Sequence, residues 1–405
     1  MRILIYWEQA AWGGVDSHLL TLLNTWPSNE DEVVLVYNKG NKGFDRIFSD
    51  ISFSGKISFL PVTSFSYNEV KRKVSRGLFK ILVPLVYCLQ PLLMLLMALR
   101  MLFVFKKIKG IDVVFADNGG YPGAHGCMAA IIAAKWSGIK GRLLMIHHAA
   151  SKANVLTSSY EKLLDRYLSG CIDTIICPSF ATRQSIFDHR FFNEENVKFL
   201  VIPNGVLMPE KPITTSPFKM PDNLNCINVC VVGRIEKYKG HEDIMQAMSM
   251  LPEGIKRNVQ LYIIGAGDED YIDRLKRLCK YLKLGDQVVF TGYVEGNSIS
   301  IIQNFDLLIS ATRTFEGFGL SIAEALSVEV PVIATSVGAV SEAFAGVVSI
   351  VPSGSAKEMS GALLQFYENR DAWKVQASQG KLRIQTYSEQ MAKTFHDEFA
   401  ITCQL

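Results

Sequence analysis

Residues 203–233 read PNGVLMPEKPITTSPFKMPDNLNCINVCVVG, and this stretch divides the chain into two parts. Five prolines fall between residues 203 and 221. Proline fixes φ and has no N–H to donate, so such a segment continues neither a helix nor a central strand. The apolar run Ile227–Val232 that follows is typical of a buried strand. The stretch is therefore predicted to be an interdomain linker that leads into the first strand of a second domain.

On each side of this linker, short apolar runs alternate with segments of helix length. Before the linker, strands are predicted at Ile3–Tyr6, Val33–Tyr37, Ile57–Leu60, Asp112–Phe115, Arg142–Ile146, Thr174–Cys177 and Lys198–Ile202. After it, they are predicted at Ile227–Val232, Gln260–Ile264, Gln287–Phe290, Leu307–Ile309, Val330–Ile333 and Val347–Val351. The pattern predicts an α/β protein of two Rossmann-like, doubly wound domains, residues 1–206 and 207–387. Ligands of such sheets bind beyond the carboxyl ends of the strands, so we expect an interdomain cleft.

The composition limits the kinds of partner. The 405-residue chain carries 42 Lys and Arg against 39 Asp and Glu, a formal net charge of +3, which provides no overall field for nucleic acid. Its eight cysteines form no CxxC pair and are predicted to be buried free thiols in a reducing cytoplasm. The opening MRILIYWEQ lacks the long apolar core and cleavage site of a signal peptide, so we expect a cytoplasmic location.

The loop after Ile227–Val232 is basic and reads GRIEKYKG over residues 233–240. Gly233 allows the backbone to approach a ligand closely. Arg234 offers a planar fork of donors suited to phosphate oxygens, and Lys239 adds a point charge. Together they could neutralise a diphosphate without a metal ion. A solvated basic loop is the alternative interpretation.

The segment FEGFGL at residues 315–320 follows a predicted strand and begins a helix. Gly317 and Gly319 leave backbone amides free to face an anion at the helix start, where the helix dipole also attracts one. Glu316 and Glu324 are separated by about 12 Å along a regular helix, at 1.5 Å per residue. That distance exceeds the separation of a glycosidase carboxylate pair. We therefore expect the two glutamates to contact different parts of one long ligand, with helix capping and solvent exposure as the alternative.

Two features lie at predicted strand ends of the first domain. Gly13-Gly14 follows the first strand but lacks the full GxGxxG spacing, so no dinucleotide cofactor is expected. His147-His148 follows the strand Arg142–Ile146 and should lie at the same edge of the sheet. A histidine there could bind a sugar hydroxyl or move a proton, although a lone histidine is more often structural. The chain shows no His, Cys and Asp grouping with metal-ligand spacing, so no metal site is predicted.

These pieces, in this order, resemble the retaining family-4 glycosyltransferases, which have the GT-B fold. The resemblance spans nearly the whole chain. The matching segments are Gly13-Gly14-Val15, His147, Val201–Val206, Val232-Gly233-Arg234, Lys239-Gly240, Ile264–Gly267, Phe290–Val294, Glu316–Gly319 and Glu324-Ala325.

The resemblance implies a retaining, metal-independent hexosyltransferase that needs no cofactor and takes a UDP-sugar or GDP-mannose as donor. Arg234 and Lys239 would grip the donor diphosphate, and Glu316 would contact the transferred sugar. His147 would lie near that sugar, with His148 as the alternative. The implied donor-binding residues are Gly13, Gly14, Gly233, Val294, Gly317, Phe318, Gly319, Leu320 and Glu324, with Glu324 at the ribose and Val294 at the base. A C-terminal helix, 388–405, would complete the first domain.

Residues 71–109 form an apolar stretch with basic residues at both ends. The segment 81–99 has no charge and is about long enough to cross a bilayer, which takes ~20 residues. A crossing would place Gly13-Gly14 and His147 on opposite sides of the membrane. We therefore favour a helix pair that lies in the plane of the cytoplasmic membrane surface and bends at its prolines, with spanning and burial against the sheet as alternatives. A surface location implies a lipid-linked or cell-envelope glycan acceptor.

Two other functions are compatible with the same motifs. A nucleotide-sugar epimerase of GT-B fold would need no acceptor. A membrane-bound subunit that binds a nucleotide sugar without catalysis would not need to keep Arg234, Lys239, Glu316 and Glu324, all of which are present.

Overall fold

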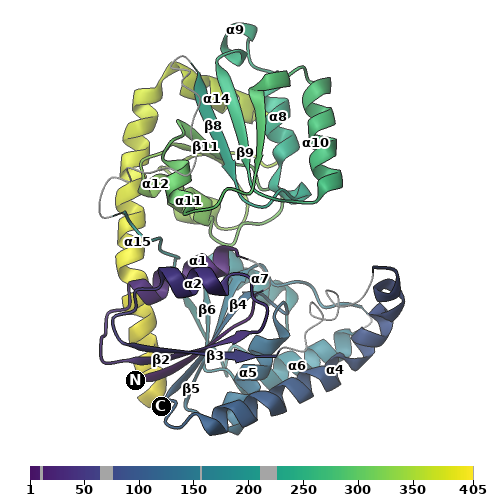
Figure 1. Ribbon diagram of the computed structural model, residues 1–405, viewed down its shortest axis with the longest axis vertical. Coiled ribbons are helices and arrows are strands. Elements are labelled where there is room, and N and C mark those ends of the chain that lie inside the picture. Colours follow the sequence, from purple (N-terminus) through teal and green to yellow (C-terminus); the bar gives the residue numbers. More distant parts are fainter. Residues whose placement is uncertain (10–11, 64–75, 156, 210–225, 405) are drawn as a thin grey trace. The chain divides into compact units, whose positions relative to one another are not determined.

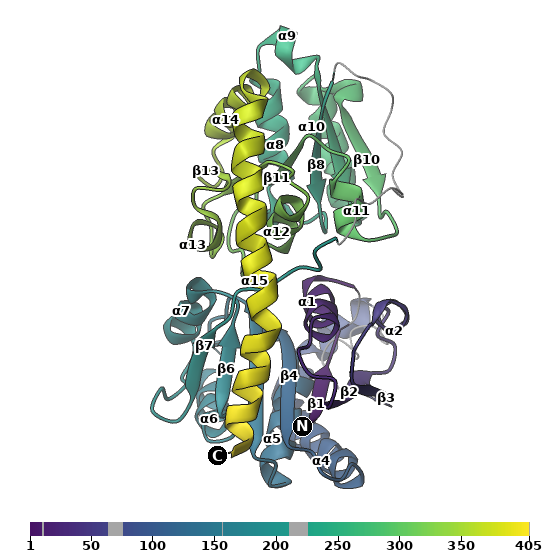
Figure 2. The same cartoon turned by 90° about the vertical axis from the view of Figure 1, so that its left-hand side faces the viewer.

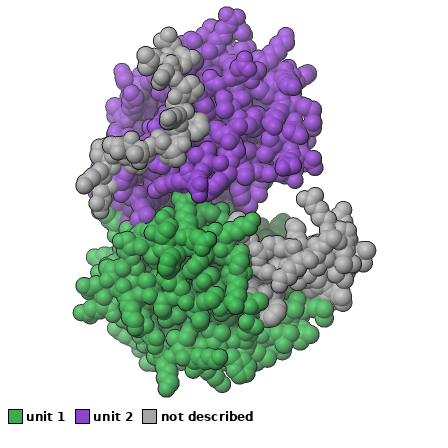
Figure 3. Space-filling view, viewed as in Figure 1, with its two compact units in different colours: residues 1–204, 389–405 green, residues 205–388 purple. Residues whose placement is uncertain are grey.

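The structure is a computed structural model that describes residues 1–9, 12–63, 76–155, 157–209 and 226–404, with the backbone alone for residues 76–88 (Figure 1). It divides into two compact units (Figure 3). Residues 1–204 and 389–405 make the first unit, and residues 205–388 make the second. Each unit is built on one parallel β-sheet with helices packed on it, which confirms the predicted α/β class.

The first unit holds a seven-stranded sheet in the order β3-β2-β1-β4-β5-β6-β7. Its strands are β1 (Arg2–Trp7), β2 (Glu32–Asn38), β3 (Lys56–Val62), β4 (Val113–Gly120), β5 (Gly141–His148), β6 (Thr174–Cys177) and β7 (Lys198–Val201). The central strands are buried on both faces, which explains why they read as continuous apolar runs rather than alternating ones. The strand order reverses between β1 and β4, and such a switch point is where doubly wound sheets bind ligands.

The helices of the first unit are α1 (Gly14–Asn24), α2 (Phe44–Asp50), α4 (Arg76–Lys107), α5 (His125–Trp136), α6 (Ser158–Ser169), α7 (Phe180–His189) and the end of α15 (Arg370–Gln404). The end of α15 packs on the sheet of this unit (Figure 2). The rings of Phe395 and Phe399 lie 5.6 and 5.4 Å from the ring of Phe115 on β4, between centroids. Glu398 accepts a hydrogen bond from the Thr174 hydroxyl at 2.6 Å. These contacts are the reason that residues 389–405 belong to the first unit.

Helix α4 is one continuous helix, so the prediction of a bent helix pair is wrong. A proline inside a helix removes one hydrogen bond but does not have to end the helix. From Leu89 onward, one face of α4 is buried in the core of the unit and lies against α5; its buried residues are Met94, Met97, Ala98, Met101 and Phe105. The opposite face is apolar but exposed; it consists of Leu89, Leu92, Leu95, Leu96, Leu99 and Phe103. Full burial of this half of the helix is therefore excluded.

The second unit holds a six-stranded sheet in the order β10-β9-β8-β11-β12-β13. Its strands are β8 (Ile227–Val232), β9 (Val259–Ile264), β10 (Val288–Gly292), β11 (Leu307–Ser310), β12 (Val332–Thr335) and β13 (Ser349–Val351). Its helices are α8 (His241–Ser249), α9 (Glu253–Lys256), α10 (Glu269–Tyr281), α11 (Ser298–Ile302), α12 (Leu320–Ser327), α13 (Val340–Phe344), α14 (Ala356–Glu368) and the start of α15, with 3-10 turns at η1 (Lys237–Lys239) and η2 (Gly285–Gln287). Each predicted strand of the chain overlaps an observed one. Residues 210–225 of the predicted linker lie outside the described residues.

A buried ion-pair network anchors the loops of the first unit. The Arg190 guanidinium is fully buried and donates to both carboxylate oxygens of Asp165, at 2.9 and 3.0 Å. It also donates to Glu161 at 2.6 Å. The Tyr121 hydroxyl donates to the same Asp165 carboxylate at 2.6 Å. Each charge in this network is therefore compensated, which a buried charge requires.

We predict that Asp165→Asn will destabilise the protein by about 3–5 kcal/mol, because it leaves the Arg190 guanidinium buried without its main counter-charge. The free energy of unfolding in urea measures the effect. Asp188→Asn is the matched control, since Asp188 is an exposed carboxylate that only accepts a hydrogen bond from Gln184. It should change stability by under about 0.5 kcal/mol. Equal stability of the two variants would contradict the prediction.

Candidate functional site

Polar side chains gather at the carboxyl ends of the strands in each unit. In the second unit, the loop after β8, the end of β11 and the start of α12 enclose one pocket. Its lining residues are Val231, Val232, Gly233, Arg234, Lys239, His241, Ile309, Ser310, Ala311, Thr312 and Ser321. The structure thus brings together three residues predicted from the basic loop, Gly233, Arg234 and Lys239. It adds the hydroxyls of Thr312 and Ser321, which the sequence motifs did not single out.

Lys239 is held in this pocket by a carboxylate and a hydroxyl. Its ammonium donates to Glu316 Oε2 at 2.9 Å and to Thr312 Oγ1 at 3.5 Å. The Thr312 hydroxyl in turn donates to Glu316 Oε2 at 3.0 Å. Gly240 makes this approach possible: its φ is +71°, and a Cβ there would lie 2.0 Å from the carbonyl oxygen of Ala311. Only glycine allows the loop to lie this close to the end of β11.

Arg234 lies at the open side of the pocket. Its guanidinium is largely exposed and donates to Glu236 Oε1 at 3.0 Å and to the Tyr238 hydroxyl at 3.4 Å. Exposed ion pairs of this kind contribute little stability, so the guanidinium can exchange these partners for an anionic ligand at small cost. Arg234 and Lys239 therefore place two cations at one pocket.

The turn Glu316–Gly319 leads from β11 into α12, as predicted. Gly319 has a φ of +102° and precedes Leu320, the first residue of the helix. Phe318 is 3% exposed, and its ring packs against Phe344 with centroids 5.3 Å apart. The Phe318 side chain is therefore part of the core, and only its backbone amide is left for a ligand. Ser321, in the first turn of α12, lines the pocket.

The structure does not bring every predicted donor residue to this pocket. Glu324 is half-buried on α12, and Val294 is half-buried against the core of the second unit. The described residues that line the pocket include neither of them. They also do not include Glu316, Gly317, Phe318, Gly319 or Leu320, so the turn contributes to the pocket wall only through Ser321, just after it. The predicted roles of Glu324 at a ribose and of Val294 at a base stay predictions.

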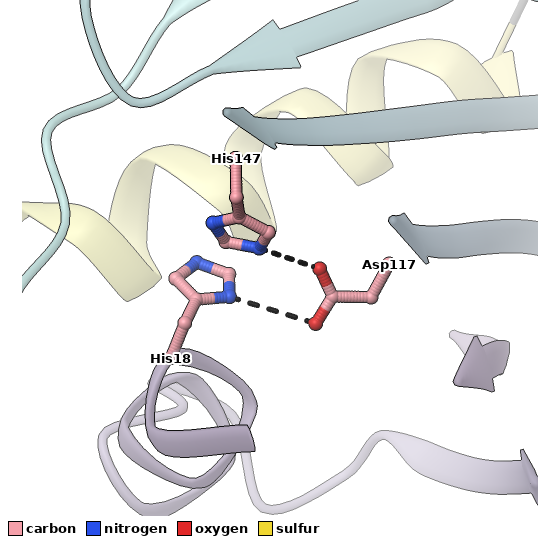
Figure 4. Close-up of side chains that lie close together, drawn as sticks. All are labelled: His18, Asp117 and His147. Atoms are coloured by element: carbon pink, nitrogen blue, oxygen red, sulfur yellow. Dashed lines mark hydrogen bonds and ion pairs between the residues drawn. The ribbon is translucent and has the colours of Figure 1, made fainter. Parts of the chain in front are cut away.

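In the first unit, three polar side chains meet near the carboxyl ends of β4 and β5 (Figure 4). His147 Nε2 lies 2.7 Å from Asp117 Oδ1. His18, on α1, has Nδ1 at 3.7 Å from Asp117 Oδ2, and its ring centroid is 4.5 Å from that of His147. The side chains of His18 and Asp117 are fully buried, whereas that of His147 is 9% exposed. We call these three residues the His–Asp–His cluster.

The charges within the His–Asp–His cluster depend on burial and on these contacts. Burial acts to raise the pKa of Asp117, but the charge and hydrogen bond of His147 and the contact with His18 outweigh it and lower the pKa to about 2. Burial lowers the pKa of His18, and the nearby His147 lowers it further. At neutral pH the cluster therefore contains a carboxylate and a neutral His18 imidazole.

The cluster also has a composition that metal ions favour. The ligating atoms of His18, Asp117 and His147 all lie within 4.8 Å of one another, a grouping that sequence spacing did not reveal. However, nitrogen and oxygen ligands at 2.0–2.1 Å from a tetrahedral zinc ion would lie about 3.3 Å apart. The 2.7 Å separation of His147 Nε2 and Asp117 Oδ1 is that of a hydrogen bond. The geometry as it stands fits a shared proton better than a shared cation.

The remaining predicted residues of the first unit lie at the same edge of its sheet. Gly14 is exposed and begins α1, and the Gly13 amide donates to Asp16 Oδ2 at 2.6 Å. Asp16 itself is fully buried, and burial raises its pKa to about 7. His148, the alternative to His147, is exposed at the end of β5.

Sequence reasoning missed Asp117 and His18. Asp117 lies near the carboxyl end of β4, next to β5, so the same strand-end argument that selected His147 could have selected it. His18 sits one turn into the helix that Gly14 begins, and no local pattern marks it.

His241 gives a prediction about pH. It begins α8, is 1% exposed, and burial lowers its pKa to about 4 from an ordinary value of 6.5. In the unfolded chain this imidazole takes up a proton as the pH falls below 6.5, but in the folded protein it cannot do so until about pH 4. Stability is therefore lost as the pH falls from 6.5 to 4, by up to about 3 kcal/mol from this group.

His241→Gln should flatten the dependence of the unfolding free energy on pH within that window, as measured by urea unfolding at stepped pH. His148→Gln removes an exposed histidine and should leave the slope as it is in the wild type. If both variants keep the wild-type slope, the assignment to His241 is wrong.

Comparison with known proteins identifies the family of the chain. A model for family-4 glycosyltransferases matches residues 12–207, and a model for group 1 glycosyl transferases matches residues 213–383. The chain is 24% identical over 296 residues to the uncharacterized glycosyltransferase MJ1069 of Methanocaldococcus jannaschii, which covers 70% of this chain and 72% of that protein. It is 26% identical over 199 residues to the alpha-monoglucosyldiacylglycerol synthase of Streptococcus pneumoniae, which covers 46% of this chain and 43% of that protein.

Among solved structures, HepE of Anabaena in complex with UDP and glucose has the same fold. The TM-score is 0.67 at 16% identity, over 98% of this chain and 100% of that one. The predicted resemblance is thus confirmed along nearly the whole chain, and the chain belongs to the family-4 glycosyltransferases of GT-B fold.

Proposed function

We propose that this glycosyltransferase is a retaining hexosyltransferase, which moves a sugar from a UDP-sugar or GDP-mannose to a lipid-linked or cell-envelope glycan acceptor. The observation that carries the proposal is the contact of Lys239 with Glu316 at 2.9 Å, in a pocket that Arg234 also lines. A pocket with two cations and a helix start suits a diphosphate. The carboxylate beside them suits the hydroxyls of the attached sugar.

The same residues account for departure of the nucleotide. When the bond between the sugar and the diphosphate breaks, negative charge develops on the phosphate oxygen. The side chains of Arg234 and Lys239 and the amides at the start of α12 would stabilise that charge. Because the protein supplies these charges itself, the proposed mechanism uses no metal ion and no other cofactor.

Transfer would form the new bond on the face of the sugar that the nucleotide leaves. The acceptor oxygen bonds to the anomeric carbon, and the departing phosphate oxygen takes the acceptor proton. Glu316 would release Lys239 to the diphosphate and accept a hydrogen bond from a sugar hydroxyl. His147 and the amide of Gly14, from the first unit, are proposed to contact the sugar and the diphosphate. The bound UDP and glucose of Anabaena HepE support a nucleotide hexose as the donor.

The exposed apolar face of α4 favours a membrane surface as the location of the acceptor. Among the described residues, the segment Leu89–Lys107 alone is long and apolar enough to cross a bilayer, by length and composition. Its buried face packs within the first unit, and these contacts would be lost if the helix crossed the membrane. The exposed leucines, with Lys106 and Lys107 at the helix end, instead suit insertion into an anionic leaflet.

This location agrees with the name of the Streptococcus pneumoniae relative, a synthase of a glucosylated diacylglycerol. We therefore propose a peripheral position on the inner face of the cytoplasmic membrane. The basic residues predicted to meet headgroups at 71–73 lie outside the described residues, as do the side chains of Arg76 and Lys80.

The donor pocket can be tested by thermal shift with UDP-glucose, UDP-galactose, UDP-N-acetylglucosamine and GDP-mannose. We expect one of them to raise the melting temperature, because a ligand of the native state stabilises it. Lys239→Gln should weaken the binding of that donor at least about tenfold, since a charge-assisted hydrogen bond contributes about 1.5–3 kcal/mol. Lys237→Gln is the matched control: Lys237 is an exposed lysine in the same turn and does not line the pocket.

Glu316→Gln should still bind the donor but transfer its sugar to a membrane lipid extract more slowly. Conversion of the donor into an epimer without any acceptor would overturn the transferase proposal. So would a Lys239→Gln protein that binds every donor as the wild type does.

The membrane proposal predicts co-sedimentation with phosphatidylglycerol vesicles and weaker binding to phosphatidylcholine vesicles. Replacing Leu95 and Phe103 together by glutamate should lower binding more than tenfold, because each inserted side chain contributes about 1.5–3 kcal/mol. Leu382→Glu, at a leucine that is 66% exposed on α15 in the second unit, is the control and should bind as the wild type does. Unchanged binding of the double variant would contradict the proposal.

A further inference from the structure

We propose that Asp117 is a positioning residue for His147: it accepts the Nε2–H of His147 and so leaves His147 Nδ1 as a hydrogen-bond acceptor for a sugar hydroxyl. The choice of a sugar hydroxyl as the ligand rests on the proposed function. Which ring nitrogen faces the carboxylate follows from the structure of the first unit alone.

The direction of the hydrogen bond follows from the chemistry of its partners. An ionised carboxylate can only accept, so the proton between Asp117 Oδ1 and His147 Nε2, 2.7 Å apart, belongs to the imidazole. In the neutral form of the imidazole there is one N–H, so the other nitrogen, Nδ1, then has a free lone pair. His147 Nδ1 makes no hydrogen bond to any residue that the structure describes. It is therefore the ring atom left to meet a ligand.

Burial of Asp117 fixes its hydrogen bond with His147. Asp117 is fully buried, so water does not compete for its oxygens, and the cost of burying its charge is offset by the contacts with the two imidazoles. The low pKa of Asp117 keeps it ionised at neutral pH. The register of β4 and β5 holds the two residues together, since Asn118 pairs with Ile146 and Gly120 with His148. Two paired strands, rather than a loop, thus set the ring position.

His18 restricts the ring further. Its imidazole meets that of His147 edge to face, at an interplanar angle of 69°. Its Nδ1 is 3.7 Å from Asp117 Oδ2, longer than a hydrogen bond, so packing holds it, including contact with Phe395 at 5.6 Å between centroids. Contact with His18 therefore limits the orientations that the His147 ring can adopt. Because His18 lies on α1, the same helix that begins at Gly14, the cluster also ties the proposed diphosphate contact to the proposed sugar contact.

An acceptor at His147 Nδ1 restricts which ligand groups can bind there. An acceptor nitrogen binds an O–H group, whereas a carboxylate or phosphate oxygen at that place offers it no hydrogen. The part of the sugar that reaches His147 should therefore carry a hydroxyl. Neutral hexoses fit this requirement, and a uronic acid with its carboxylate at that position does not.

Nuclear magnetic resonance of the ligand-free protein tests the protonation state. Long-range proton–nitrogen correlation spectra of histidine-labelled protein distinguish the two neutral forms, and His147→Gln identifies the signals. We expect wild-type His147 to carry its proton on Nε2. In Asp117→Asn, the amide can donate to Nε2, so the Nδ1–H form should appear. Asp188→Asn removes an exposed carboxylate of the same unit and should leave the His147 signals unchanged.

An Nδ1–H form in the wild type, or an unchanged spectrum in Asp117→Asn, would overturn the inference. So would a stoichiometric zinc ion in the purified protein that Asp117→Asn loses, because the cluster would then be a metal site.

Kinetics with the donor found by thermal shift test the role of the ring. Asp117→Asn should lower kcat by roughly 10- to 100-fold and change KM less than about threefold. The expected reason is that His147 loses its orientation toward the reacting sugar, which slows transfer more than it weakens binding. In the His147→Ala background the same substitution should have an effect of under about threefold, since residues that act as a unit are not additive. Additive effects would show that Asp117 is merely structural.

The two proposals can fail separately. If no nucleotide sugar raises the melting temperature, the proposed function is overturned. The His147 spectrum should still be as predicted. A spectrum that does not respond to Asp117→Asn would overturn the positioning role and leave donor binding to the second unit intact.

Discussion

Parallel pairing of the strands is the constraint on which the rest of this molecule depends. All paired strands in both sheets run in one direction, so their carboxyl ends share one edge in each unit. Loops that are far apart in the sequence therefore meet at that edge. Lys239 follows β8 and Glu316 follows β11, two neighbouring strands. Asp117 and His147 lie near the carboxyl ends of the neighbouring strands β4 and β5. Both candidate sites arise from the same geometric rule.

The two sites use carboxylates in a similar way. In each, an acidic side chain holds a nitrogen group in one place: Glu316 holds the Lys239 ammonium, and Asp117 holds the His147 imidazole. They differ in burial, since Asp117 is fully buried and Glu316 is 16% exposed. A partly exposed pair can open when an anion arrives, because solvent compensates the charges that separate. A buried pair keeps its geometry, which suits a group that has to stay oriented.

Two long helices, α15 and α4, add features to the first unit that its sheet alone does not provide. Helix α15 supplies Phe395 and Phe399 to the core of the first unit, beside His18 of the His–Asp–His cluster. Helix α4 covers α5 with one face and leaves the other apolar face exposed. If the acceptor is lipid-linked, as proposed, such a face would hold the enzyme at the surface where the acceptor lies.

Local patterns in the chain were enough to predict the alternating strands and helices, the proline-rich break and the glycine-containing basic loop with Lys239. These features depend on side-chain periodicity and on the backbone chemistry of a few neighbouring residues. The partners of those residues were not predictable in the same way. Asp117 lies 99 residues after His18 in the sequence, yet the two side chains meet in one cluster with His147. The sequence of α4 is apolar throughout, although from Leu89 onward only one of its faces is buried. Strand order and helix packing join residues through long crossovers, and no short stretch of sequence records which strands become neighbours.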